Sequence, residues 1–187
     1  MNRNRIAEEY LAVADEVFGS LWFGIEKLAA EIARRLRKGA KLMLCGNGGS
    51  AADAQHVAGE MVNRFFKDRR PYAAIALSTD TSVLTSIGND YSYDLVFEKQ
   101  VKALGRKGDV LLAISTSGKS ESVCRAVAAA KRMGILTVGL TGGRGGRLAA
   151  MVDRPVVVSS SSCTPRIQEG HQLVIHALCQ RIEELLK

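Results

Sequence analysis

Four side chains at helical spacing could transfer protons or bind a metal ion. His56 and Glu60 lie four residues apart in a segment predicted to be helical, so they project from one face. Gln168 and His176 lie eight residues apart near the end of the chain, again roughly on one face of a helix. An imidazole and a carboxylate can act as general acid and general base, and their nitrogen and oxygen atoms can also bind a divalent metal. Taken alone, such a His and Glu pair is more often a solvated pair on a helix, and His176, which stands among apolar residues, is compatible with a core histidine.

Two polar loops have the composition of anion-binding sites. Residues 45–50 (CGNGGS) and 115–120 (STSGKS) each follow an apolar run and precede a predicted helix. Small residues let backbone N–H groups approach a phosphate, hydroxyls add donors, and a helix N-terminus is the positive end of its dipole. Either loop alone could be a tight turn with a helix cap. Two such loops on one sheet edge favour a phosphate site.

Neither loop matches a nucleotide-binding motif in full. A P-loop needs a glycine where this chain has Ala113. Gly46, Gly48 and Ala51 satisfy the loose G-x-G-x-x-A pattern of dinucleotide-binding folds. The acidic residue expected after the next strand is represented only by Asp80, which comes later than the usual spacing of about 20 residues. We therefore expect no nucleotide cofactor, and a nicotinamide or flavin oxidoreductase is a less favoured alternative.

Short apolar runs alternate with segments predicted to be helical. The predicted strands are 41–45, 72–77, 109–114, 136–140 and 156–158. Such a pattern is typical of a mainly parallel sheet covered on both faces, in which ligands bind at the carboxyl ends of the strands. We therefore predict one α/β domain over residues 1–187, with three layers (α/β/α) and a roughly five-stranded sheet. Residues 1–38 form a helical N-terminal segment, as one amphipathic helix or two.

Composition narrows the class of protein. With 47% hydrophobic residues in 187, the chain can bury one sizeable core. No apolar run approaches the ~20 residues that span a membrane, and the first residues do not resemble a signal peptide. The four cysteines form no C-x-x-C pair, so we expect reduced thiols in a cytoplasmic protein.

The net charge of +7 raises the possibility of nucleic-acid binding. The densest basic cluster, residues 34–41, ends a predicted helix, where cations interact favourably with the helix dipole. Aromatic residues make up 5% of the chain and are not interleaved with that cluster. Both observations argue against a nucleic-acid partner.

Residues 114–120 (ISTSGKS) resemble the phosphate loop of the SIS-fold family of sugar isomerases. The resemblance extends along nearly the whole chain through 45–56, 87–90, 110–118 and 166–171 together with His176, and these segments jointly resemble the phosphoheptose isomerases of that family. It implies the SIS fold, with the N-terminal helices forming the interface of a homotetramer.

The resemblance also implies roles for individual residues. Glu60 would be the general base and His176 the general acid. A zinc ion would be held by His56, Glu60, Gln168 and His176. Substrate contacts would come from Asn47, Gly48, Gly49, Ser50, Glu60, Arg64, Asn89, Asp90, Ser115, Thr116, Ser117, Ser120 and Gln168. Pro165 departs from the acidic residue that family members can carry there, so no role of that acid is transferred.

The implied reaction converts the ketose sedoheptulose 7-phosphate to the aldose D-glycero-D-manno-heptose 7-phosphate through an enediol. It would be the first step of ADP-heptose synthesis for the bacterial lipopolysaccharide core. An isomerase for pentose or hexose phosphates is a further alternative, because loop composition does not measure sugar length. A non-catalytic adaptor of the same fold, which binds the replication initiator protein, is the alternative from another class. Glu60 and His176 discriminate against it, because an adaptor does not need a paired acid and base.

Overall fold

A single five-stranded parallel sheet organises the chain. The computed structural model describes residues 3–186 of the 187. The strand order is β2-β1-β3-β4-β5, and every pairing is parallel, as the alternation of apolar runs and helices predicted. The strands are β1 (Leu42–Cys45), β2 (Ala74–Ala76), β3 (Val110–Ser115), β4 (Leu136–Gly142) and β5 (Arg154–Val158).

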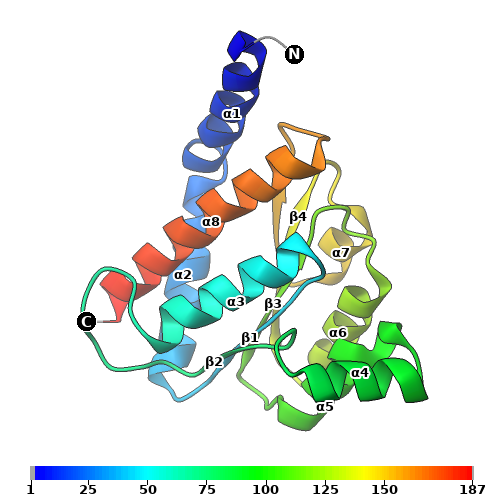
Figure 1. Cartoon of the computed structure of the whole chain (residues 1–187). Helices are drawn as coiled ribbons and strands as arrows, with labels where there is room; N and C mark the ends of the chain where they lie inside the picture. Colours follow the sequence, from blue (N-terminus) through cyan, green and yellow to red (C-terminus); the bar gives the residue numbers. More distant parts are fainter. Residues whose placement is uncertain (1–2, 187) are drawn as a thin grey trace.

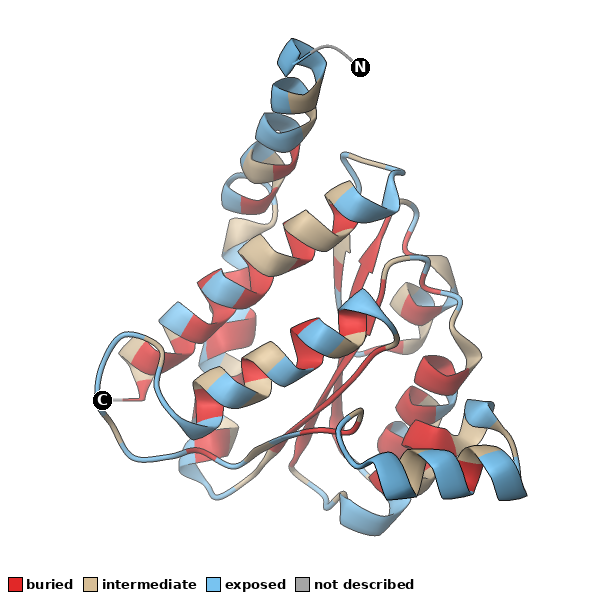
Figure 2. Ribbon diagram, in the orientation of Figure 1, coloured by how far each residue is buried: buried red, intermediate tan, exposed pale blue. Residues whose placement is uncertain are grey.

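Helices cover both faces of this sheet (Figure 1). They are α1 (Arg3–Phe18), α2 (Trp22–Arg37), α3 (Gly49–Val62), α4 (Thr81–Asp90), α5 (Val96–Leu104), α6 (Glu121–Arg132), α7 (Gly146–Met151) and α8 (Thr164–Leu185), with a short 3-10 helix η1 (Tyr93–Leu95). One face carries α1, α2, α3 and α8, and the other carries α4 to α7, with an apolar core on each side. Because β1, β3 and β4 are buried along their whole length (Figure 2), their sequences consist mainly of apolar residues.

The N-terminal segment forms two helices, which the sequence left open. α1 ends at Phe18, before Gly19, and α2 begins at Trp22. A Cβ atom on Gly19 would lie 2.6 Å from the Asp15 carbonyl oxygen, so a glycine is needed at this turn. α1 projects from the body of the molecule and packs mainly on α8 (Figure 1). No helix in the described part of the chain is long and apolar enough to cross a membrane.

Candidate active site

The two polar loops meet at the carboxyl ends of β1 and β3, which are neighbouring strands. Together they line a cavity of about 190 Å³, which we call the cradle. Its lining residues are Asn47, Ser50, Ile114, Ser115, Thr116, Ser117 and Ser120. Six of these seven were predicted to contact substrate, and the hydroxyls and the helix N-termini of α3 and α6 give the cradle the chemistry of a phosphate site.

Glycine shapes the second loop. Gly118 has a φ of 62°, and a Cβ atom there would lie 2.1 Å from the carbonyl oxygen of Gly145. The backbone also bonds across this contact, because the N–H of Leu148 in α7 donates to the Gly118 carbonyl at 2.9 Å. Any larger residue would push the serine loop away from the turn that precedes α7, so the close approach fixes the loop.

Asn47 connects the cradle to segments on either side. Its amide nitrogen donates to the Ser120 hydroxyl at 2.8 Å and to the Ser122 hydroxyl at 3.1 Å. Its amide oxygen accepts a hydrogen bond from the hydroxyl of Tyr93, at 2.8 Å. Sequence reasoning missed Tyr93 and Ser122. The only signal for Tyr93 was its position shortly after Asp90, in a segment already assigned to substrate binding.

His56, Glu60 and His176 form a second group of functional side chains, which we call the proton-transfer cluster. His56 Nε2 lies 3.2 Å from Glu60 Oε1 and 3.4 Å from His176 Nε2. The two imidazole rings meet edge to face with centroids 4.9 Å apart. Partial burial lowers the pKa of His176, proximity to His56 lowers it further, and the Glu60 carboxylate acts in the opposite direction. A largely neutral imidazole beside a carboxylate can move protons at neutral pH.

The register between α3 and α8 brings the cluster together. Gly49 faces Gln168 so closely that a Cβ atom on the glycine would lie 2.3 Å from the Gln168 Nε2. One turn further on, the Gln172 amide donates to the Asp53 carboxylate, and the next turn brings His56 to His176. The helices therefore run parallel and side by side (Figure 1), and residues about 120 positions apart in the chain meet at each turn.

The cradle and the proton-transfer cluster are separate within one chain. His56 comes seven residues after Gly49 and so lies roughly 10 Å further along α3, at 1.5 Å per residue. None of the three cluster residues lines the cradle cavity. A ligand that uses both must be extended, with a phosphate at one end and its reacting carbons at the other.

Three residues predicted to contact substrate do not line the cradle cavity and have no hydrogen bond to the cluster among those described. Asn89 and Asp90 are exposed at the end of α4, where their side chains bond each other at 2.9 Å. Arg64 was expected one helical turn beyond Glu60, but α3 ends at Val62, so Arg64 is exposed in the loop that follows. Their substrate contacts stay predictions.

The predicted zinc ligands do not form one coordination sphere in this arrangement. Two of the other predicted ligands, Glu60 and His176, lie 3.2 and 3.4 Å from His56 Nε2. Gln168, however, lies beside Gly49, two turns and roughly 12 Å along α8 from His176. No group of three or more His, Cys, Asp and Glu side chains in residues 3–186 is arranged to hold a metal ion. We therefore derive no catalytic step through zinc.

The chain is similar to known proteins over most of its length. The model of the SIS domain matches residues 7–142. A phosphoheptose isomerase of Nitratiruptor sp. is 52% identical over 176 residues, which are 94% of either chain. One of Thiobacillus denitrificans is 54% identical over 164 residues, 87% of this chain and 83% of the relative.

Solved structures of phosphoheptose isomerases are similar to this chain in fold as well as in sequence. A phosphoheptose isomerase from Neisseria gonorrhoeae superposes with a TM-score of 0.88 at 45% identity, covering 97% of this chain and 98% of the other. One from Francisella tularensis gives a TM-score of 0.91 at 37% identity, covering 97% and 96%.

Proposed function

Because this chain belongs to the phosphoheptose isomerases of the SIS-domain family, we propose that it converts sedoheptulose 7-phosphate to D-glycero-D-manno-heptose 7-phosphate. Family membership makes it a sugar-phosphate isomerase and so confirms the expectation of an enzyme. The similarities give no support to the alternative of a non-catalytic adaptor.

One observation carries the choice of substrate: the distance between the cradle and the proton-transfer cluster. An extended polypeptide backbone advances ~3.5 Å for every three bonds, and an extended sugar chain advances by a similar amount. By this measure, a seven-carbon chain with a terminal phosphate spans roughly 10 Å. The offset between Gly49 and His56 along α3 is similar, at roughly 10 Å. A heptose 7-phosphate in its open form can therefore place its phosphate in the cradle and its first carbons near His56, whose Nε2 lies 3.2 Å from the Glu60 carboxylate. A pentose phosphate would fall short by two carbons.

The proposed mechanism uses the two ends of the cluster. Glu60 removes a proton from C1 of the open-chain ketose, and the electrons of the C–H bond form the enediol double bond. His176 supplies a proton to the carbonyl oxygen on C2, so that the enediol is neutral. Reprotonation at C2, with loss of the proton on the C1 oxygen, gives the aldose. No electrons leave the substrate, so the reaction needs no redox cofactor.

His56 joins the acid and the base, because its Nε2 atom contacts both Glu60 and His176. Within the proposal, the ring of His56 orients the Glu60 carboxylate. Zinc binding by His56, Glu60, Gln168 and His176 belongs to the proposal too. Such binding would require Gln168 to move toward the other three, because its side chain lies beside Gly49.

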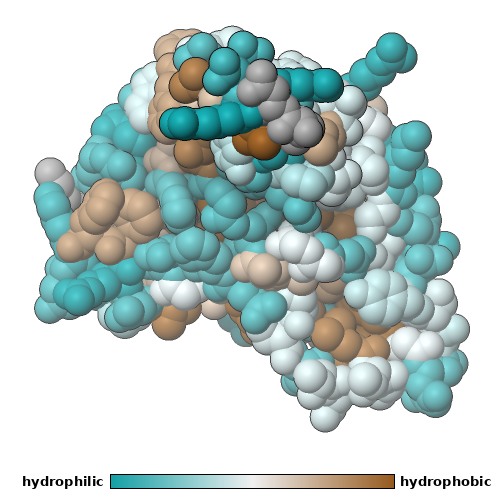
Figure 3. All heavy atoms as spheres, turned by 45° about the horizontal axis from the view of Figure 1, so that its top comes forward, coloured by the Kyte–Doolittle hydropathy of each residue, from teal (hydrophilic) through white to brown (hydrophobic). Residues whose placement is uncertain are grey.

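We also propose the pathway, the location and the assembly of the protein. The reaction would be the first step of ADP-heptose synthesis for the lipopolysaccharide core, and it would take place in the cytoplasm, where phosphorylated sugars are made. Assembly would be a homotetramer. Figure 3 shows hydrophobic surface among hydrophilic residues on the face that carries the start of α1. Tyr10, Leu11, Phe18 and Phe23 on the first two helices are each about half exposed or more, which is costly unless another chain covers them.

The experiment is a comparison of substrates. Purified protein is incubated with sedoheptulose 7-phosphate and, separately, with hexulose and pentulose phosphates, and the products are followed by NMR. The proposal predicts the aldoheptose 7-phosphate as the product and the highest kcat/KM for the seven-carbon ketose. If a shorter ketose phosphate were turned over faster, that sugar would take the place of sedoheptulose 7-phosphate as the proposed substrate. No turnover of any would reject the proposed reaction.

A further inference from the structure

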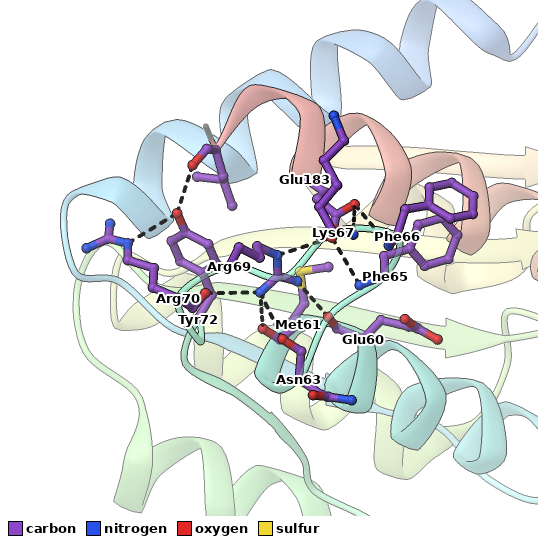
Figure 4. A network of polar contacts seen from close by, with 11 residues as sticks. Glu60, Met61, Asn63, Phe65, Phe66, Lys67, Arg69, Arg70, Tyr72 and Glu183 are labelled. Carbon is purple, nitrogen blue, oxygen red and sulfur yellow. Dashed lines mark hydrogen bonds and ion pairs between the residues drawn. The ribbon is translucent and has the colours of Figure 1, made fainter.

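The loop between α3 and β2 carries an arginine that binds the end of α3 (Figure 4). Arg69 donates from Nη2 to the Glu60 carbonyl oxygen at 2.7 Å and from Nη1 to the Met61 carbonyl oxygen at 2.9 Å. The last carbonyls of a helix have no partner within the helix, and a cation is favoured there by the helix dipole. Arg69 therefore holds the backbone of the residue that we assign as the base.

The same loop is held by a buried carboxylate on α8. Glu183, with 5% of its side chain exposed, accepts hydrogen bonds from the N–H groups of Phe65, Phe66 and Lys67 at 3.0, 3.0 and 3.2 Å. Arg69 Nε lies 3.4 Å from its Oε1 atom, as an ion pair outside hydrogen-bond geometry. Burial disfavours the charged form, but these N–H groups and Arg69 outweigh it, so the pKa of Glu183 is lowered. The carboxylate is ionised and fully engaged.

This ion pair connects both helices of the proton-transfer cluster. Glu183 follows His176 by seven residues, two turns along the same face of α8. Arg69 holds the last turn of α3, where Glu60 lies. The turn that Glu183 holds by its backbone N–H groups places the centroid of the Phe65 ring 5.8 Å from that of the His176 ring, with an angle of 43° between the ring planes.

We propose that Arg69 and Glu183 are positioning residues, which hold Glu60 and His176 at their working separation and seat Phe65 on the His176 ring. The inference rests on the proposed function for the roles of Glu60 and His176. Neither Arg69 nor Glu183 lines the cradle or contacts the imidazoles or the Glu60 carboxylate. Their effect is therefore on geometry, through the end of α3 and the turn that follows it.

Glu183→Gln tests the proposal with little change of volume, because the amide can accept fewer of the three backbone hydrogen bonds and carries no charge for Arg69. We expect kcat to fall by about 10- to 100-fold, as for a displacement of reacting groups by about 1 Å. KM should stay within about twofold, because the cradle lies at the other end of α3. Arg69→Lys keeps the charge but lacks the planar fork that reaches both carbonyls and the Glu183 carboxylate from one group. It should likewise lower kcat and leave KM nearly unchanged.

Asp109→Asn is the matched control. Asp109 is also a buried carboxylate, with 5% of its side chain exposed. Like Glu183, it accepts backbone hydrogen bonds, here from the N–H groups of Lys41 and Arg106, and it forms an ion pair with the Lys41 ammonium. It lies just before β3, at the amino edge of the sheet and away from the cluster. Loss of stability alone would affect both variants, but only Glu183→Gln should lower kcat.

Histidine-labelled NMR gives a readout independent of turnover. The chain has three histidines, and displacement of the Phe65 ring should shift the His176 resonance in Glu183→Gln. His171, buried on the opposite side of α8, should keep its resonance. An unmoved His176 resonance with kcat within about twofold of wild type would overturn the proposal, as would an equal fall of kcat in Asp109→Asn. Absence of turnover in the wild type would reject the proposed function, and the His176 resonance would still decide the positioning role.

Discussion

His56 and His176 are 120 residues apart in the chain, yet their Nε2 atoms lie 3.4 Å apart. α3 follows β1 and α8 follows β5, and both helices cover the same face of a parallel sheet. Each must run back against the strand direction, so the two are parallel to each other. Contacts then repeat at every turn from Gly49 and Gln168 onward. The sheet topology thus brings the proposed base, in the first third of the chain, together with the proposed acid in the last quarter.

The serine loop should determine affinity for the phosphate. Ser117→Ala combined with Ser120→Ala removes two hydroxyls from the cradle, and each lost hydrogen bond to a charged phosphate should cost roughly 1.5–3 kcal/mol. Calorimetric titration with the phosphorylated sugar measures the loss, and the unphosphorylated sugar is the control, whose weak binding should not change. Unaltered affinity for the phosphorylated sugar in a folded double variant would remove the cradle as the phosphate site.

Much of the scaffold could be predicted because its strands are buried on both faces. β1 and β3 consist almost entirely of apolar residues, which a sequence pattern detects, and the loops that follow them then had to meet at one edge. The strand predicted at 72–77 proved shorter, Ala74–Ala76, at one edge of the sheet, whereas the other edge strand, predicted at 156–158, proved longer, Arg154–Val158.

Long-range features had no local signal. The end of α3 at Val62, which moves Arg64 off the helix, lies where Arg69 caps the carbonyls of Glu60 and Met61. No periodicity predicts that Arg69 would face Glu183 across 114 residues. The hydrogen bond from Tyr93 to Asn47 likewise depends on how η1 packs beside the cradle. These contacts follow from tertiary packing, which a single sequence does not specify position by position.

Acid should destabilise the protein through His171. Burial lowers the pKa of this histidine from 6.5 to about 4, although the backbone of Thr141 acts in the opposite direction. Between these values the unfolded chain binds the proton and the folded chain does not. Stability is therefore unaffected by this group above pH 6.5 and is lost as the pH falls toward 4, by about 3 kcal/mol in all.

Urea unfolding of wild type and His171→Gln between pH 4 and 7 measures this difference. The variant should lose less stability over that range, because glutamine does not titrate. Carboxylates contribute equally to both proteins, so they cancel in the comparison. Parallel curves for the two proteins would show that His171 does not carry the pH dependence.

Zinc should copurify with the protein if the cluster binds it. His56→Gln removes the atom that contacts both Glu60 and His176, so its zinc content, measured by elemental analysis, should fall well below that of wild type. His171→Gln removes another histidine outside the cluster and should leave the content unchanged. Full activity in protein shown to be free of metal would mean that zinc is not required.

Proton transfer through a base that exchanges with solvent leaves an isotopic record. If Glu60 removes the C1 proton, reaction in D2O should place deuterium at C2 of the aldose, at least in part, whereas a hydride shift would carry the original hydrogen across without exchange. Glu60→Gln keeps the size of the side chain and its position beside His56 but removes its basicity, so turnover should fall by roughly 10²–10⁴-fold. His176→Gln should show a comparable loss if it is the acid, and Gln180→Ala, an exposed change one turn further along α8, should not. Near-normal turnover in correctly folded Glu60→Gln, or an aldose without deuterium, would exclude Glu60 as the exchanging base.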